Sequence, residues 1–215
     1  IPEFMTRVVA TIAQEARQSP HLNQRSGVSV RMSVACQEAL AANALRRAVR
    51  TGDSVAVPRV SDLDALPAAM AGKVEVDSLD EDRDGEILTR IVQAAVLSVF
   101  RDLVPGALHR GVVEAFDTHE GVSTGDDLGA STYAEVTTEI PALSTAVVAV
   151  LGDESDKTDK PVAGMDTALL ASAVELVLEG LHLSRRLNKQ VSGPQSRYSS
   201  REMESGSSSG GLAGS

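Results

Sequence analysis

The sequence predicts an all-α protein, on the basis of its composition and of the spacing of its apolar residues. Only 2% of the 215 residues are aromatic and Trp is absent, so the core has to be built from Ala, Val, Leu and Ile. Such cores are typical of packed helices, because Ala has the highest helix propensity and its small side chain allows close approach. Apolar residues also recur at intervals of three and four, which is the period of an amphipathic helix.

The first predicted helix covers residues 1–18 and ends before Pro20. Its inward face consists of apolar residues at helical spacing, namely Met5, Val8, Val9, Ile12 and Ala16. The leading "IPEF" is either native or introduced by cloning. We expect further helices over 30–50, from Ser61 onward, and over 86–104, 107–117, 132–140, 142–151 and 165–189.

The helix over 30–50 is predicted to end at Gly52, because a glycine often closes a helix in the left-handed conformation. The residues expected on its inward face are Val34, Leu40, Ala44, Leu45 and Val49. In the next helix, Ser61 is the expected N-cap, with Asp62 and Asp64 in the first turn.

Between the helices we expect little regular structure. Residues 73–79 alternate and predict a short strand or an extended connector, and the Gly/Ser/Asp-rich residues 118–131 predict a flexible loop. The segment 192–215 is rich in Ser and Gly and has few apolar residues, so it cannot bury enough surface to offset its ordering entropy. The sequence therefore predicts a disordered tail from Ser192.

Charge and cysteine content limit the environment and the partners. Residues 1–60 carry eight Lys/Arg and four Asp/Glu, whereas residues 61–160 carry seven and twenty-one. An acidic middle argues against nucleic-acid binding, because phosphates dominate that affinity. A single cysteine, Cys36, excludes an internal disulfide and indicates a reducing compartment. Without a signal-type segment or a run long enough to span a membrane, the predicted location is cytoplasmic.

Three short motifs resemble functional loops, and each departs from its pattern. "DEDRDGEI" begins like a calcium loop at Asp80, but the twelfth place is Ile91 where a bidentate carboxylate is required. "GVSTG", with Ser123 at its centre, lacks the preceding buried strand of a nucleophile elbow. "VVAVLGDE", residues 147–154, resembles a Walker B strand, but no G-x-x-x-x-G-K-[ST] phosphate loop precedes it.

No metal site is predicted either. The four histidines, His21, His109, His119 and His182, do not pair at metal-ligand spacing, and one cysteine offers no thiolate cluster. Cys36 lies within a predicted helix and is expected to be a small core residue.

The stretch "NQRSGVSVRMS" places Arg31 in the first turn of a helix whose expected N-cap is Ser29. A cation there is disfavoured by the helix dipole, by about 0.3–1 kcal/mol. One explanation is a solvent-facing arginine or a local salt bridge. The other is that Arg31 and the helix N-terminus point together at an anion, since free N–H groups and a guanidinium favour phosphate.

The segment "SGVSVRMSVACQEALAANALRRAVRTGDSVAVPRVSDL" resembles the helical lid of AAA+ ATPases of the MoxR and magnesium-chelatase type. The pattern is a G-x-S-x-R opening, a long helix rich in Ala, Leu and Arg, a Gly-Asp turn and an extended segment before another helix. "SPHLNQRSGVSVRMS" and "VELVLEGLHLSRRLNK" are similar to bacterial chelatase subunit I-like proteins, some of which are labelled sigma-54-interacting regulators.

The resemblance implies roles for two arginines. Arg31 stands where the family has its sensor-2 arginine, which reaches from the lid to the γ-phosphate of ATP, and it is therefore the candidate catalytic and nucleotide-binding residue. Arg25 is a weaker candidate for a nucleotide or subunit contact, with a solvated loop arginine as the alternative. The MoxR branch often has Pro before the arginine, where this chain has Val30.

The resemblance also implies an organisation. Residues 1–72 would form the lid-like helical domain and residues 73–191 an acidic helical extension, and the phosphate loop and Walker B strand would lie upstream. ATP and Mg²⁺ would then bind the full-length parent, with neither expected to bind this fragment tightly. The expected partners are the N-terminal AAA+ core of the same protein, neighbouring subunits of a ring and a von Willebrand A-type subunit.

Two other functions stay open at this point. One is a stand-alone α-helical interaction module whose acidic middle docks a basic partner. The other is a fragment of a transcription regulator, although the first sixty residues contain no recognisable DNA-reading helix. The sequence predicts no binding to membranes and none to nucleic acid.

Overall fold

A computed structural model describes residues 1–23, 28–76, 83–156 and 166–201. The chain is mostly helical, as its composition predicts, and it adds a small sheet. The helices are α1 (Glu3–Gln18), α2 (Val30–Thr51), the 3-10 helix η1 (Val60–Ala65), α3 (Leu66–Met70), α4 (Asp84–Leu103), α5 (Gly106–Phe116), α6 (Ala130–Glu139), α7 (Pro141–Asp156) and α8 (Thr167–Leu183). The strands are β1 (Val122–Gly125), β2 (Leu187–Ser192) and β3 (Gln195–Ser200).

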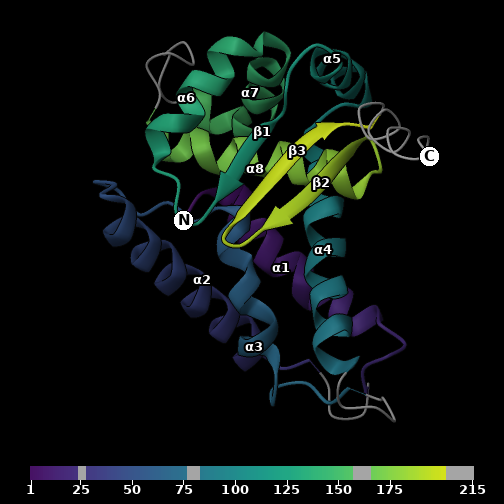
Figure 1. Cartoon of the computed structure of the whole chain (residues 1–215). Coiled ribbons are helices and arrows are strands. Elements are labelled where there is room, and N and C mark those ends of the chain that lie inside the picture. The colour runs from purple at the N-terminus through teal and green to yellow at the C-terminus, as the bar shows by residue number, and fades with distance from the viewer. Residues whose placement is uncertain (24–27, 77–82, 157–165, 202–215) are drawn as a thin grey trace, which may run out of the picture.

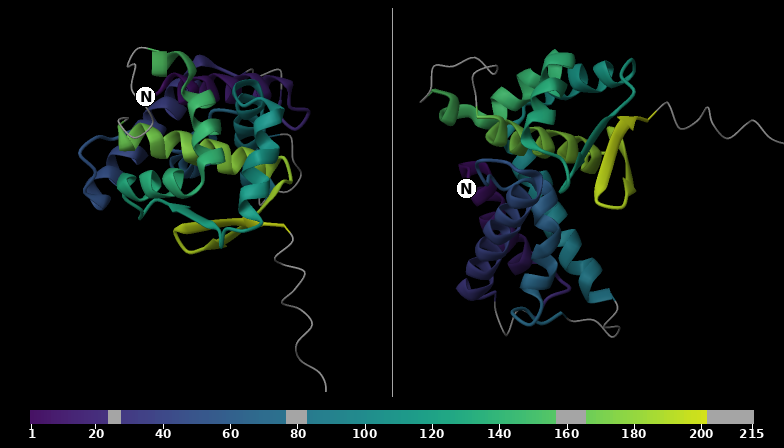
Figure 2. Two further views of the ribbon diagram at one scale, coloured as in Figure 1. Left: turned by 90° about the horizontal axis from the view of Figure 1, so that it is seen from above. Right: turned by 60° about the vertical axis from the view of Figure 1, so that its left-hand side comes forward.

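Helix α8 lies at the centre of the molecule. It is apolar on nearly all sides, and every residue from 170 to 181 is buried. A helix that is hydrophobic all round has to be enclosed by other elements. Helices α4, α6 and α7 pack against it, as do η1 and β2, and Figures 1 and 2 show the sheet lying across α8 and the upper end of α4.

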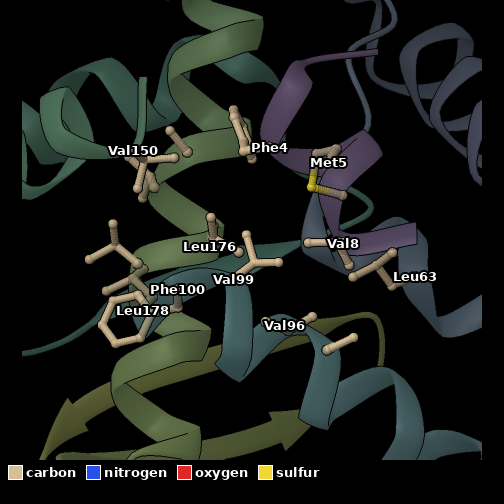
Figure 3. Close-up of a cluster of buried hydrophobic side chains, with 14 of the residues drawn as sticks. Phe4, Met5, Val8, Leu63, Val96, Val99, Phe100, Val150, Leu176 and Leu178 are labelled. Carbon is tan, nitrogen blue, oxygen red and sulfur yellow. The ribbon is translucent and has the colours of Figure 1, made fainter. Parts of the chain in front are cut away.

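One continuous core joins the two ends of the chain. Its buried apolar side chains extend from Phe4 to Tyr198. Helix α1 packs against α4, and Figure 3 shows Met5 and Val8 of α1 near Val96 and Val99 of α4. The leading "IPEF" segment takes part, because Phe4 is only 4% exposed. The ranges 1–72 and 73–191 therefore share a core.

Helix α2 occupies the edge of the molecule, where it contacts α1, α3 and η1 (Figure 1). Its end at Gly52 is confirmed: this residue is left-handed (φ 74°), and its N–H group donates to the Ala48 carbonyl. The predicted inward face is only partly right. Leu40 and Ala44 are buried, but the remaining three residues of that prediction, Val34, Leu45 and Val49, are exposed. The buried face is rotated toward Met32, Cys36 and Arg47.

The sequence predicts a helix with its N-cap at Ser61, and this prediction is wrong. The N-cap is Arg59, whose backbone N–H donates to the Asp62 carboxylate at 2.8 Å. The Ser61 N–H instead donates to Oε2 of Glu175 on α8, also at 2.8 Å. Contacts with distant residues therefore convert the predicted helix start into a 3-10 turn, which is followed by the short α3.

The sheet is the main feature that the sequence did not predict. Its strand order is β1-β3-β2, with both pairs antiparallel, and β2 and β3 form a hairpin around Gly193 and Pro194. Strand β1 lies within the predicted loop 118–131, and β2 replaces the predicted end of the last helix. Residues 195–200 form β3, with Tyr198 buried, so the disorder predicted from Ser192 is wrong for these residues. The remainder of the predicted tail, residues 202–215, lies outside the described part of the chain.

Among the described residues, no single helix is long and apolar enough to cross a membrane. Only α4 and α5 together reach that length and composition, and they are bent by 107° at the break between them.

Two glycines inside helices provide a test of the packing around α8. At Gly180 an added Cβ would lie 2.1 Å from Cγ of the buried Phe100, whereas at Gly111 it would meet only Cβ of Ala142 at 3.8 Å. We expect Gly180→Ala to lower the free energy of unfolding by about 1–3 kcal/mol through overpacking. Gly111→Ala should raise it by up to about 1 kcal/mol, because Ala favours the helix. Urea denaturation of both variants measures this, and equal effects would contradict the packing described.

Candidate functional site

Arg31 lies at the beginning of α2, as the sequence predicts, and it is exposed. Its guanidinium has no hydrogen bond or ion pair with any residue that the structure describes. Ser29 occupies the N-cap position with extended backbone angles, but its side chain makes no capping hydrogen bond. The local salt bridge that could have explained the cation is thus absent from the described part of the chain.

Arg25, the second candidate, lies outside the described residues.

An apolar strip runs along the exposed side of α2. Val30, Val34, Leu45 and Val49 are between 50% and 77% exposed. At 3.6 residues per turn they fall within an arc of ~100° around the helix, and Arg31 projects from the edge of the same arc. We call these five residues the outer face of α2. The four apolar residues form two pairs, because Val34 and Leu45 lie ~16 Å apart along the axis and the exposed Glu38 stands between them in the same arc.

A buried group of charges fixes the opposite side of α2. We call Arg47, Asp53, Arg59 and Asp62 the arginine–aspartate cluster. Nη2 of Arg47 lies 2.9 Å from Oδ2 of Asp62, and Nη2 of Arg59 lies 3.1 Å from Oδ2 of Asp53. Both arginines and Asp62 are at most 2% exposed. Such buried charges are tolerated only when they are paired and hydrogen-bonded.

The cluster connects α2, the loop with Asp53 and Val57, η1 and the start of α6. Arg47 comes from α2, and its Nη2 also donates to the Val57 carbonyl at 2.6 Å. Oδ1 of Asp53 accepts the N–H group of Ala130, the first residue of α6, at 2.8 Å. Nη1 of Arg59 donates to the Leu128 carbonyl, and its guanidinium lies 4.8 Å from the centre of the Tyr133 ring. The cluster therefore holds α2, η1 and the start of α6 together.

A cavity of about 330 Å³ lies between η1, α4, α8 and the sheet. Two buried glutamates one helical turn apart on α8, Glu175 and Glu179, contribute to its wall, together with Asp64 of η1 and Lys189 of β2. Side chains of α4, the sheet and the end of α8 complete the wall, among them Val92, Val96, Thr124, Leu183, Ser196 and Tyr198.

Glu175 is held by neutral donors. Its Oε1 accepts the Tyr133 hydroxyl at 2.6 Å, and its Oε2 accepts the Ser61 N–H. Burial raises the pKa of Glu175, while the charge of Arg59 and these hydrogen bonds oppose the shift. Burial is also the main reason that the pKa of Tyr133 is raised. The pair therefore favours the protonated forms more than the same groups do in water.

Glu179 has the charged partner. Nζ of Lys189 lies 2.8 Å from its Oε2, which also accepts the hydroxyl of Tyr198. The Lys189 ammonium is 5.6 Å from the centre of the Tyr198 ring. Burial, followed by the charge of Glu179, raises the pKa of Tyr198. This arrangement fastens the hairpin of β2 and β3 to the central helix.

No motif in the sequence marks the charged residues of the cluster or of the cavity wall as a site, and Asp62 and Asp64 were expected only in the first turn of a helix. Two of them could have been noticed in the sequence, because Glu175 and Glu179 are the only charged residues within the apolar α8. Arg47 offered a weaker one, since it lies on the same helical face as Leu40 and Ala44. Asp62 and Lys189 gave none, because their partners are distant in the chain.

The three rejected motifs have structural explanations within the described residues. Helix α4 begins at Asp84, so Ile91, at the twelfth place of the calcium-like pattern, is already helical. "GVSTG" forms β1, not the flexible loop predicted for it. A Cβ at Gly121 would lie 2.7 Å from the Tyr198 carbonyl oxygen, and one at Gly125 would lie 2.6 Å from that of Pro194. The two glycines therefore allow β1 to approach the hairpin.

The "VVAVLGDE" segment is part of α7, with a break at Gly152 (φ 35°, ψ −120°). Cys36 is a buried core residue, as predicted, and its pKa is raised to about 11, chiefly by burial. In the described part of the chain, no three His, Cys, Asp or Glu side chains are grouped so that they could hold a metal ion.

Comparisons with known proteins do not add a relative: no family model, no curated protein and no solved structure matches this chain.

The arginine–aspartate cluster can be tested at Asp62. We expect Asp62→Asn to lower the free energy of unfolding by about 3–5 kcal/mol, because it leaves the buried Arg47 without its closest counter-charge. The control is Asp102→Asn, which breaks the exposed pair of Asp102 with Arg7 at 2.6 Å and should cost less than about 1 kcal/mol. Chemical denaturation at neutral pH compares the two, and similar losses would mean that the cluster does not stabilise the fold as described.

Proposed function

We propose that this chain is the lid and C-terminal helical region of an AAA+ ATPase of the chelatase and MoxR-like type. In this role Arg31 would contact the γ-phosphate of ATP held by the nucleotide-binding core of the same protein. The observation that carries the proposal is the exposed guanidinium of Arg31 at the open N-terminus of α2, without a partner among the described residues.

The electrostatics of the helix start support an anionic partner. The dipole of α2 disfavours a cation in its first turn, and nearby carboxylates do not compensate for it, because the first turn contains no acidic residue. A phosphate would reverse this situation, since it would interact favourably with both the helix N-terminus and the guanidinium. An arginine that stabilises charge on the γ-phosphoryl oxygens acts mainly on the transition state of phosphoryl transfer.

The outer face of α2 supports docking of a nucleotide-binding core beside the phosphate. Val30 and Val34 lie within about one turn of Arg31, and Leu45 and Val49 lie ~21–27 Å further along the same helix. Covering them would stabilise a closed state by removing apolar surface from water. The same contact would bring Arg31 to a nucleotide that the core holds.

The arginine–aspartate cluster would give Arg31 a defined position. It fixes the C-terminal half of α2 to η1 and α6, so the helix would move with the body of the lid when the nucleotide state changes. No described group of residues suits Mg²⁺, so the metal would be held by the core and by the phosphates. Contacts with neighbouring subunits of a ring and with a von Willebrand A-type subunit belong to the same proposal, as does remodelling of a partner.

A stand-alone helical interaction module is the second candidate. The outer face of α2 favours it as well, because four exposed apolar residues suit a protein partner without any nucleotide. The two candidates differ at Arg31, which only the ATPase requires.

The ATPase proposal predicts a specific effect of Arg31→Ala in the full-length enzyme. ATP turnover should fall about tenfold or more, as is typical when a charged hydrogen bond to the transition state is lost. The melting temperature should not change, because Arg31 makes no described contact. The matched control is Arg46→Ala, which removes another exposed arginine of α2 and should leave turnover unchanged. Equal turnover in both variants would favour the interaction module.

The docking surface is tested separately with Leu45→Asp and Val49→Asp. Both should weaken the coupling between the lid and the core, seen as a reduced ATPase rate and a lower affinity when the two parts are mixed, because they place a charge in an apolar interface. Val191→Asp changes a valine of β2 that is 67% exposed, and it should have no effect. If all three variants behave like the parent, the outer face of α2 does not dock the core.

A further inference from the structure

The cavity between η1, α4, α8 and the sheet is lined mainly by uncharged groups. Its apolar lining comes from η1, from α4 and from the end of α8, and it includes Leu63, Val92, Val96 and Leu183. The volume of about 330 Å³ is at the lower end of the usual range for small-molecule pockets. Such pockets typically combine apolar walls with a few polar groups that orient the ligand. The polar groups of this wall therefore indicate which ligand it suits.

The carboxylates of the wall are already compensated or lie in solvent. Both oxygens of Glu175 accept hydrogen bonds from neutral donors. Glu179 is paired with Lys189 at 2.8 Å. Asp64 is exposed, so water solvates its carboxylate. A charged ligand would lose its hydration in the cavity without finding a free buried counter-charge, which is unfavourable. The wall therefore favours an uncharged ligand.

Lys189 is the polar group of the wall that has donors to spare. An ammonium group carries three N–H donors, and among the described residues Nζ of Lys189 has only the Glu179 carboxylate as an acceptor. The ammonium lies 5.6 Å from the centre of the Tyr198 ring, and both residues line the cavity. A hydrogen bond from a charged donor is stronger than one between neutral groups. The cavity therefore favours a ligand with an acceptor oxygen.

We propose that this cavity binds a small uncharged organic molecule, whose carbonyl oxygen accepts a hydrogen bond from Nζ of Lys189 and whose apolar part packs against Val92, Val96 and Leu183. A cation does not fit, because the Lys189 ammonium would repel it. An anion does not fit, because Glu179 already neutralises that ammonium. Arg31 does not line the cavity, so the inference does not depend on the ATPase proposal.

The test is titration of the 215-residue chain with benzamide, benzoate and benzamidinium, followed by amide chemical shifts. The three molecules have nearly the same size and shape, but the first is uncharged, the second negative and the third positive. We expect saturable shifts at cavity residues with benzamide, and at least about tenfold weaker binding of both ions, because a buried charge without a counter-charge is unfavourable. Equal or tighter binding of either ion, or an absence of saturable shifts with benzamide, would overturn the proposal.

A matched pair of threonine variants locates the binding. Thr89→Phe adds bulk at an exposed position of α4 that lines the cavity, and it should weaken benzamide about tenfold or more. The control is Thr138→Phe on α6, away from the cavity, which should bind like the parent. Both threonines are exposed, and each donates its hydroxyl to the carbonyl four residues earlier, so the two substitutions should affect folding alike. Equal affinities of the two variants would refute the assignment of the cavity.

The role of the ammonium is tested with Lys189→Met, which keeps the apolar stem and removes the donors. Benzamide should bind about tenfold more weakly, as is typical when a hydrogen bond to a charged group is lost. The control is Lys73→Met, which removes an exposed ammonium that does not line the cavity and should leave the affinity unchanged. Parent-like affinity in a folded Lys189→Met variant would contradict the hydrogen bond to Nζ. If that variant does not fold, the comparison of Thr89→Phe with Thr138→Phe decides.

Discussion

The Asp62 carboxylate organises the N-terminal half of this protein. It accepts the guanidinium of Arg47 and the backbone N–H of Arg59, so it both pairs a buried charge and begins η1. A buried guanidinium without a counter-charge is very unfavourable, and Arg47 must therefore face η1. This requirement turns one side of α2 inward, and it leaves Val34, Leu45 and Val49 on the outside although they are apolar.

The exposed strip on α2 and the buried cluster are thus two consequences of one constraint. The cluster fixes the helix near its C-terminal end, and Arg31 lies ~24 Å away from Arg47 along the axis. At the start of the helix, Arg31 is exposed and makes no hydrogen bond or ion pair with the described residues. The proposed role as a lid over a nucleotide would use this combination of a fixed end and an exposed arginine.

Helix α8 plays a comparable role for the second half. Its apolar surface is enclosed by helices on most sides, Glu175 faces α6 and η1, and Glu179 faces the sheet. Tyr133, Lys189 and Tyr198 reach these glutamates from three different elements. The hydrogen bonds make the buried carboxylates tolerable.

The sequence by itself determined the features that depend on local order. The helical class, the position of most helices, the left-handed Gly52, the burial of Cys36 and the place of Arg31 at a helix start all follow from periodicity, propensity and capping among near neighbours. The exposure of Arg31 agrees with both explanations that its sequence context allowed, a solvent-facing arginine and an arginine directed at an anion.

Only the tertiary structure decided the features that join distant residues. The strands β1 and β3 are short and polar. Each pairs with a segment about seventy residues away along the chain, and no local sequence pattern predicts this pairing. The rotation of α2 and the cavity wall depend likewise on Asp62, Glu175 and Lys189 finding partners on other elements. Charges inside a protein must be paired. Packing decides which residues form each pair, because the energy of a buried ion pair depends on the distance between the charges in space and not on their separation in the sequence.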